Sequence, residues 1–244
     1  MIKTFSITDV GKKRQLNQDY VYTSEMPVGK LPNLFIVADG MGGHKAGDYA
    51  SRCTVETIVE AVSKSELESY EDIIREAIEK ANAAVFEQSI SKEEYNGMGS
   101  TVVVATCINE ETLLVANVGD SRLYCIGKKM EQITLDHSYV EEMVRQGKIS
   151  PADAKNHPDK NIITRAIGVD CTVEIDFFHA MLAEEDIILM CSDGLTNMLD
   201  DKEIRTVLES RKDIVSKAEE LVNAANRNGG KDNIAVVLVK PFAK

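Results

Sequence analysis

The chain has 244 residues, of which 40 are Asp or Glu and 28 are Lys or Arg, so its formal net charge is −12. This charge excludes nucleic-acid binding through a basic face, because such affinity comes mainly from Lys and Arg on phosphates, and it disfavours anionic membrane surfaces. Hydrophobic residues make up 43% of the chain, which is enough to fill a core and excludes general disorder.

The first predicted elements are a buried strand and two helices. Residues 34–38 are wholly apolar, as expected of a buried strand, and residues 46–62 are predicted to form a helix entered through glycines. Apolar residues recur at helical spacing from Ile73 to Val85. Four strand-like runs then follow with gaps of only two to three residues, which fit antiparallel hairpins: 101–108, 112–118, 121–126 and 130–134.

The second half mixes helices with further strands. A short helix is predicted over residues 137–146, and a longer one from Ile214 to Ala225 ends at a glycine stop signal. Four more runs are predicted strands: 162–167, 173–179, 187–191 and 234–239. The order lacks regular β-α-β alternation and contains no linker or repeat. It predicts one α+β domain over residues 1–244, with antiparallel sheets covered by helices.

Two sequence features bear on the compartment. The longest apolar run, residues 234–239, is six residues long, whereas a membrane helix needs about 20, so no membrane insertion is expected. The N-terminal segment has no apolar stretch typical of a signal peptide. The five cysteines are widely spaced and form no C-x-x-C pair, which argues against a disulfide framework or a cysteine zinc site. We therefore expect a cytoplasmic protein.

Aspartates recur where predicted strands meet glycine-bearing turns: Asp39, Asp120, Asp193 and Asp232, with Asp19 nearer the N-terminus. Each alone is explained equally well as a turn or cap residue. If the strand ends converge, however, two carboxylates about 4 Å apart repel by about 4 kcal/mol at an effective dielectric constant of about 20. A fold keeps such a cluster when a divalent cation occupies it, and oxygen ligands suit Mg²⁺ or Mn²⁺ rather than zinc.

The glycine-rich segment after Asp39 does not match a nucleotide-binding loop. Residues 40–47 follow a strand and open a helix, but the G-x-G-x-x-G template needs glycine where Lys45 stands, and no Gly-Lys-Ser/Thr is present. We expect the glycines to let the backbone approach a metal ion instead, with the Gly40 carbonyl as a ligand.

Six motifs in order resemble the metal-dependent protein phosphatases (PPM, type 2C), and in particular the short bacterial Ser/Thr phosphatases that consist of the catalytic domain alone. The resemblance spans nearly the whole chain. The motifs are Arg14-x-x-Asn17-Gln-Asp19, Asp39-Gly-Met-Gly-Gly-His44, Gly97-Met-Gly-Ser-Thr101, Val118-Gly-Asp-Ser-Arg122, Cys191-Ser-Asp-Gly-Leu195 and Gly230-Lys-Asp-Asn-Ile234.

The resemblance implies a four-layer α-β-β-α sandwich of two mainly antiparallel sheets flanked by helices. It also implies hydrolysis of phosphoserine and phosphothreonine by direct attack of a water that bridges two Mn²⁺ or Mg²⁺ ions, without a phosphoenzyme. A third ion is optional. By resemblance, Asp39 bridges the two ions, Asp193 and Asp232 hold one of them, and the Gly40 carbonyl holds the other. Asp19 acts through metal-bound water, and Asp120 with Asp193 holds the third ion. Arg14 binds the substrate phosphate.

One motif departs from the pattern of many eukaryotic members, which carry a proposed general-acid histidine at the third position of Asp-Gly-x-Gly-Gly. Met41 occupies that position here, and bacterial relatives share this arrangement. His44 is our candidate to protonate the leaving alkoxide, and a purely structural role is the alternative. We expect His137, His157 and His179 to be structural, with capping the expected role near His137.

The polar segment of residues 146–161 contains two prolines and is predicted to be a loop with a short helix. By resemblance it is the flap beside the active site that affects substrate choice; an ordinary surface connection is the alternative. Expected partners are phosphorylated proteins, including a membrane-anchored Ser/Thr kinase that the enzyme opposes, and we expect a monomer. Three other functions remain open: a non-catalytic phosphoprotein binder, a Mg²⁺-stabilised structural module, and hydrolysis of small phosphate esters.

Overall fold

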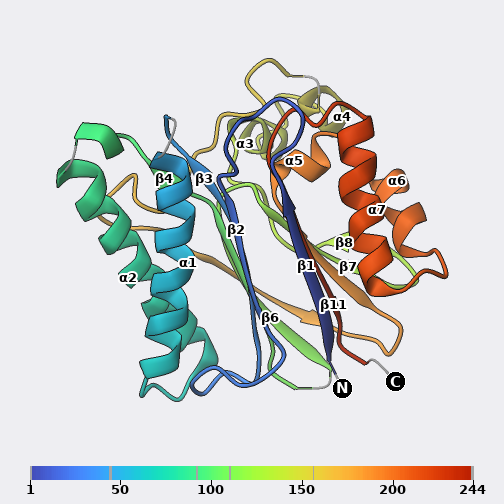
Figure 1. The fold of residues 1–244 in the computed structure, drawn as a ribbon, viewed down its shortest axis with the longest axis horizontal. Coiled ribbons are helices and arrows are strands. Elements are labelled where there is room, and N and C mark those ends of the chain that lie inside the picture. The colour runs from blue at the N-terminus through green and yellow to red at the C-terminus, as the bar shows by residue number, and fades with distance from the viewer. Residues whose placement is uncertain (1, 44–45, 92, 110, 156, 243–244) are drawn as a thin grey trace.

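The structure is a computed structural model that describes residues 2–43, 46–91, 93–109, 111–155 and 157–242. Two antiparallel sheets lie face to face, and helices cover the outer face of each, so the layers run α-β-β-α (Figure 1). This arrangement confirms the fold class predicted from the sequence.

The first sheet brings together the two ends of the chain. Its N-terminal and C-terminal strands pair antiparallel, from Lys3 opposite Lys240 to Asp9 opposite Ile234. The sheet has five strands in the order β1 (Lys3–Asp9), β11 (Ile234–Lys240), β10 (Ile187–Cys191), β7 (Arg122–Ile126) and β8 (Met130–Gln132).

The second sheet is built largely from the strand meander in the middle of the chain. All its pairings are antiparallel, and the short strand β4 (Gly99–Ser100) pairs with one end of β3. The other strands lie in the order β2 (Asp19–Ser24), β3 (Leu34–Met41), β5 (Val102–Cys107), β6 (Thr112–Val118) and β9 (Asp176–Met181).

Two pairs of helices form the outer layers. The helices α1 (Ala46–Lys64) and α2 (Tyr70–Ser91) cover the second sheet, and α6 (Asp201–Leu208) and α7 (Ile214–Arg227) cover the first (Figure 1). Three short helices gather at one end of the sandwich, and a 3-10 turn, η1, follows α2: α3 (Tyr139–Arg145), α4 (Pro151–Ala154), α5 (Asp193–Thr196) and η1 (Glu93–Tyr95).

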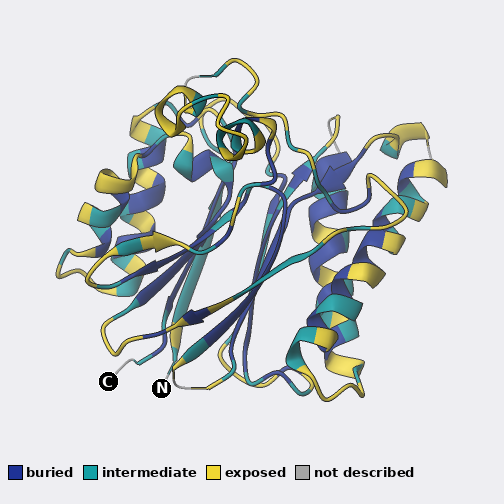
Figure 2. Cartoon of the chain, turned by 180° about the vertical axis from the view of Figure 1, so that it is seen from behind, coloured by how far each residue is buried: buried dark blue, intermediate teal, exposed yellow. Residues whose placement is uncertain are grey.

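The apolar strands are apolar throughout because both of their faces are buried. In β3, Leu34 and Ile36 pack toward α1 and α2, whereas Phe35 and Val37 pack between the sheets. Alternate residues of β11 likewise separate into the inter-sheet core and the core under α7. Figure 2 shows the result, with buried strands inside and exposed residues on the outer sides of the helices.

Several predicted elements differ from the structure. The strand predicted over residues 162–167 is wrong: its only pairings are isolated bridges of Ile163 with Ser138 and of Ile167 with Ser100. Because these partners belong to different segments, no continuous ladder forms. The next strand, β9, begins at Asp176 instead of residue 173. Strands β1 and β2 and helix α6 were not predicted, since the two strands are only half-buried and carry mixed polar and apolar residues.

Candidate active site at the strand ends

Five aspartates, called the aspartate cluster below, meet at one end of the sandwich. Asp19 and Asp39 lie directly opposite each other in the neighbouring strands β2 and β3. Asp193 begins α5 after β10, and Asp232 stands just before β11, the strand that pairs with β10. Asp120 lies in the turn between β6 and β7, which joins the two sheets. Each sheet therefore contributes one pair of carboxylates, and Asp120 lies on the connection between them.

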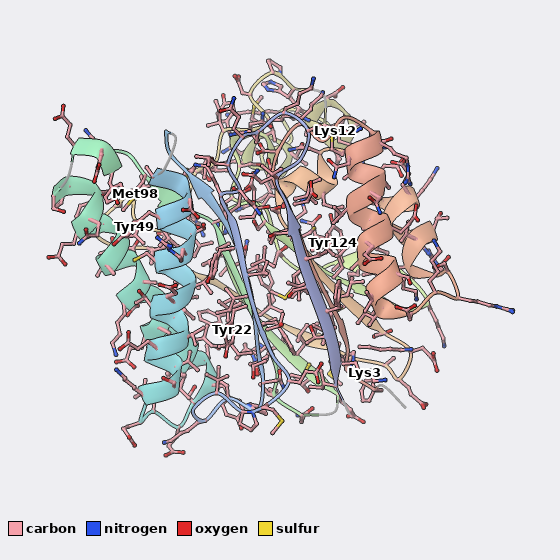
Figure 3. The ribbon with its side chains drawn as sticks, in the orientation of Figure 1. Lys3, Lys12, Tyr22, Tyr49, Met98 and Tyr124 are labelled. Atoms are coloured by element: carbon pink, nitrogen blue, oxygen red, sulfur yellow. The ribbon has the colours of Figure 1, made fainter. Side chains whose placement is uncertain are left out.

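Four of these aspartates open onto one cavity of about 460 Å³. Asp39, Asp120, Asp193 and Asp232 line it, together with Arg14 and Gly40. Asp19 lies behind them and is only 5% exposed. Figure 3 shows which end this is: Lys12 lies beside the short helices, and Lys3 lies at the far end of β1.

Burial and mutual repulsion perturb the cluster strongly. Burial first, and then the charges of Asp193 and Asp232, raise the pKa of Asp19 to about 8. The pKa of Asp120 is raised to about 7 and that of Asp193 to about 6, in both cases by burial first and by a neighbouring aspartate second. Burial and four neighbouring aspartates raise the pKa of Asp39 well above its usual range. The fold thus holds these groups together at a cost that positive charge would remove.

The donor set fits divalent cations. All the charged groups are carboxylates, which suit hard cations. Asp19 Oδ1 is buried with no hydrogen-bond partner in the described chain, and such an orphaned oxygen needs a partner of its own. Asp39, a member of the second-sheet pair, acts at short range on both Asp19 and Asp193 and so links the two pairs. No three acidic, histidine or cysteine side chains of the described residues surround one point at ligand distance.

Gly40 and Arg14 also lie where the sequence motifs suggest. A Cβ atom at Gly40 would lie 1.9 Å from the Gly47 carbonyl oxygen, so only glycine allows the loop after β3 to close on the start of α1. Arg14 Nη2 donates to Asp232 Oδ2 at 2.8 Å, and its half-exposed side chain lines the cavity. His44, our candidate acid, lies outside the described residues.

His137 is a buried structural residue rather than a candidate for proton transfer. Its Nδ1 accepts a hydrogen bond from the Gly119 backbone N–H at 3.0 Å, and Nε2 lies 3.0 Å from Asp176 Oδ2. Because Nδ1 must accept, Nε2 carries the proton and donates to Asp176. The N-cap of α3 is the next residue, Ser138.

Sequence reasoning gave no role to three polar residues that hold the cluster in place. Thr101 Oγ1 accepts from the Asp39 N–H at 3.0 Å, Ser192 Oγ donates to Asp19 Oδ2 at 2.6 Å, and Asn197 Nδ2 donates to Asp193 Oδ2 at 2.9 Å. Thr101 and Ser192 stand inside the recognised motifs. Asn197 follows Asp193 by four residues, which places it one helical turn on.

The C-terminal end of the segment of residues 146–161 borders the cavity. The segment contains α4, whose Ser150 and Asp153 form a capping box. Lys160 and Asn161 line the cavity, and Lys160 Nζ donates to Asn197 Oδ1 at 3.1 Å. Since Asn197 also contacts Asp193, the segment is linked to the cluster through one side chain.

Comparison with known proteins fits this geometry. The sequence profile of the family described as "Protein phosphatase 2C" matches residues 11–239. The chain belongs to the protein phosphatase 2C family. The "Serine/threonine phosphatase stp" of Listeria innocua is 41% identical over 238 residues, covering 96% of this chain and 93% of the relative. This type 2C chain is thus a protein serine/threonine phosphatase, and its substrates are phosphoproteins.

Solved structures of similar phosphatases agree in fold. The serine/threonine phosphatase Stp1 from Staphylococcus aureus has a TM-score of 0.91 at 35% identity, covering 98% of this phosphatase and 94% of that chain. The catalytic domain of the serine threonine protein phosphatase PstP, solved in complex with two manganese ions, has a TM-score of 0.84 at 29% identity, covering 98% and 97%. In the described part of this phosphatase, no helix is both long and apolar enough to cross a bilayer.

Proposed function

We propose that this phosphatase hydrolyses phosphoserine and phosphothreonine in proteins with the help of Mn²⁺ or Mg²⁺ held by the aspartate cluster. The observation that carries the proposal is the collection of five aspartates at one cavity, with Asp19 buried behind the other four and with raised pKa values on Asp19, Asp39, Asp120 and Asp193. Bound cations would offset the repulsion within such a cluster and so stabilise it. The manganese-bound PstP structure is similar over nearly the whole chain, which supports the same cofactor here.

The residues divide the work of binding the cations. Asp39 acts at short range on both Asp19 and Asp193, and it would be shared by the two ions. Asp193 and Asp232, which adjoin the ends of the neighbouring strands β10 and β11, would hold one ion, and the Gly40 carbonyl would hold the other. Asp19 would act through water, and Asp120 with Asp193 would hold an optional third ion. When bound, the cations supply the positive charge that activates water and stabilises a phosphoryl oxygen.

The protein groups around the cavity bind and orient the substrate. Arg14 has a half-exposed guanidinium at the cavity wall, where it can leave Asp232 and bind two phosphate oxygens as a fork. His44 is proposed to donate a proton to the leaving serine or threonine oxygen. Because the reaction is a direct hydrolysis, no side chain has to carry the phosphoryl group.

The wider roles follow from the same assignment. We propose that the enzyme is one domain that works as a monomer in the cytoplasm and opposes a Ser/Thr protein kinase. Residues 146–161 act as a flap that influences which phosphoproteins enter, since Lys160 and Asn161 stand at the cavity wall.

Activity assays test the proposal directly. Hydrolysis of a phosphothreonine peptide and of p-nitrophenyl phosphate is measured with Mn²⁺, with EDTA, and in the variant Asp193→Asn. We expect Mn²⁺-dependent turnover of both substrates and its loss in the variant. Absence of Mn²⁺-dependent turnover would indicate a phosphoprotein binder or a structural module, and turnover of the small ester alone would indicate a small-molecule phosphatase.

The role of His44 has its own test in the same assays. In His44→Ala we expect a loss of about 100-fold on the phosphothreonine peptide, whose leaving alkoxide needs a proton, and little loss on p-nitrophenyl phosphate. An equal loss on both substrates would contradict the proton-donor role.

A further inference from the structure

Ser192 is the N-cap residue of α5, yet its hydroxyl makes no hydrogen bond to that helix. The other four recorded N-caps, Ser138, Ser150, Asp200 and Asp213, all accept from the backbone N–H three residues on. Such a cap stabilises a helix by about 1 kcal/mol. Ser192 gives up this contact, so its hydroxyl is held by something else.

The hydroxyl of Ser192 is held between the two sheets. Its Oγ accepts from the Ala235 backbone N–H at 2.9 Å and lies 2.6 Å from Asp19 Oδ2. A serine hydroxyl has one proton, and because the amide of Ala235 can only donate, that proton goes to Asp19. Ser192 is 1% exposed and Asp19 is 5% exposed, so water does not compete for either contact.

The contact has a direct consequence for the geometry of Asp19. With Oδ2 fixed by Ser192, the rotation of the carboxylate is set, and Oδ1 is the oxygen left free and buried. Asp19 belongs to β2 in the second sheet, whereas Ser192 follows β10 and Ala235 lies in β11, both in the first (Figure 1). The hydrogen bond therefore spans the sandwich at the height of the aspartate cluster.

A second hydrogen bond between the two sheets is formed by the residue next to Asp232. The buried Asn233 accepts from the Gln18 backbone N–H through Oδ1 at 2.9 Å, and its Nδ2 donates to the carbonyls of Val10 and Leu16. Asp193 and Asp232 therefore each have a sequence neighbour that forms a hydrogen bond to β2 or to the residue before it, at the edge of the second sheet.

We propose that Ser192 is a positioning residue that orients Asp19 and sets the separation between the two carboxylate pairs, so that they can share divalent cations. It acts through Asp19 and touches neither substrate nor cation. The inference rests on the metal-binding role proposed above, and it assigns to Ser192 a function separate from capping.

The test is an isothermal calorimetric titration of Mn²⁺ into metal-free protein, which measures the affinity for Mn²⁺. Wild type, Ser192→Ala, Asp19→Ala and the double variant are compared. Since partners that orient a metal ligand typically contribute 10- to 100-fold to metal affinity, we expect Ser192→Ala to weaken Mn²⁺ binding about tenfold. The same change in the Asp19→Ala background should have almost no effect, because the group that Ser192 orients is gone.

Two further variants separate positioning from general stability. Ser192→Thr keeps the hydroxyl and should restore most of the affinity. Ser89→Ala removes another buried hydroxyl, one that donates to the Phe86 carbonyl in α2, and should leave Mn²⁺ affinity unchanged. If Ser192→Ala does not fold, Ser192→Cys, with a similar shape but a weak donor, should show the loss instead.

The outcomes are distinguishable. Wild-type protein that binds no Mn²⁺ would overturn the metal-binding role itself. Wild-type protein that binds Mn²⁺ while Ser192→Ala, or Ser192→Cys in its place, binds equally well would overturn the positioning role alone. An equal loss with and without Asp19 would show that Ser192 does not act through Asp19, which also contradicts the inference.

Discussion

Two groups of buried and partly buried charged side chains lie beside each other in this phosphatase and differ in how their charges are balanced. The aspartate cluster gathers five carboxylates with raised pKa values on four of them. The second group, called the paired cluster here, comprises Arg122, Asp136, His137, Arg165 and Asp176. Its acids are matched by donors: Arg122 Nε and Nη2 bind Asp136 at 2.6 to 3.0 Å, and Arg165 binds Asp176 at 2.9 Å.

The pKa of Asp176 in the paired cluster shifts in the opposite direction to the pKa values of Asp19, Asp39, Asp120 and Asp193. Burial alone would raise the pKa of Asp176, but hydrogen bonds and charge from His137 and Arg165 outweigh burial and lower it. In the aspartate cluster burial and like charges act together. Burial of a carboxylate is therefore no sign of function by itself. What marks the site is burial without matching protein cations, beneath a cavity that a ligand can enter.

Removing one carboxylate from the aspartate cluster should produce the largest effect. In Asp39→Asn we expect kcat/KM with Mn²⁺ to fall at least about 1000-fold, because the carboxylate that links the two pairs is replaced by a neutral amide, a much weaker cation ligand. The metal-free variant should nevertheless melt at a higher temperature than metal-free wild type, since a buried charge and its repulsion are gone. Retained activity, or a metal-free melting temperature below that of metal-free wild type, would contradict the claim that the aspartate cluster binds cations at a cost in stability.

The matching change in the paired cluster should lower the stability of the protein and leave its affinity for Mn²⁺ almost unchanged. Asp136→Asn leaves the partly buried Arg122 without its countercharge, and we expect the free energy of unfolding to fall by about 2 kcal/mol. Urea denaturation measures the loss, and Mn²⁺ titration of the folded variant should give nearly wild-type affinity. A variant as stable as wild type would show that the pairing is dispensable.

The pH dependence of stability should separate the clusters without mutation. Between pH 6.5 and 8 the folded, metal-free protein retains protons on Asp120 and Asp19, whose pKa values are about 7 and 8, whereas the unfolded chain has lost them. The folded state binds more protons, so its stability falls as the pH rises, by about 2 kcal/mol over this window. Burial lowers the pKa of His137, which therefore affects stability mainly below this window.

Thermal melts in EDTA and in Mn²⁺ at several pH values measure this slope. We expect the metal-free melting temperature to decline toward pH 8 and the stabilisation by Mn²⁺ to grow. A flat metal-free profile would mean that the cluster is not under the strain described.

The smallest effect is expected at the cation that borders the aspartate cluster. Arg14 and Asp232 form a partly exposed pair, and such pairs contribute little to stability. Arg14→Ala should raise KM for a phosphothreonine peptide about tenfold with almost no change in melting temperature. Arg227→Ala, which removes a surface pair with Glu220, serves as the control and should change neither quantity. An unchanged KM in Arg14→Ala would remove Arg14 from substrate binding.

Much of the aspartate cluster could be predicted from the sequence alone, because a strand that is buried on both faces appears in the sequence as an unbroken apolar run. Asp39 and Asp193 follow runs that are apolar at every position, and the structure shows why: both faces of these strands are covered. Strand ends on one side of a sandwich meet, so aspartates that adjoin them also meet. The placement of Asp19 came from its motif instead, since β2 is half-buried and gives little periodic signal.

The contacts between segments could not be predicted in this way. The register that sets Asp19 opposite Asp39, and the hydrogen bond from Ser192 to Asp19, join residues far apart in the chain. The periodicity of apolar residues in the sequence indicates whether a residue is buried, but it does not indicate which distant residue that residue contacts. The same limit explains the error at residues 162–167, whose apolar residues are paired only singly with different segments.

The most direct test of the central claim is an anomalous difference map at the manganese edge from crystals of wild-type protein soaked in Mn²⁺, compared with Asp39→Asn. The account predicts manganese peaks within ligand distance of Asp39, with Asp193 and Asp232 on one side, and weakened or missing peaks in the variant. Strong manganese peaks elsewhere, or none in the cavity above the aspartate cluster, would contradict it.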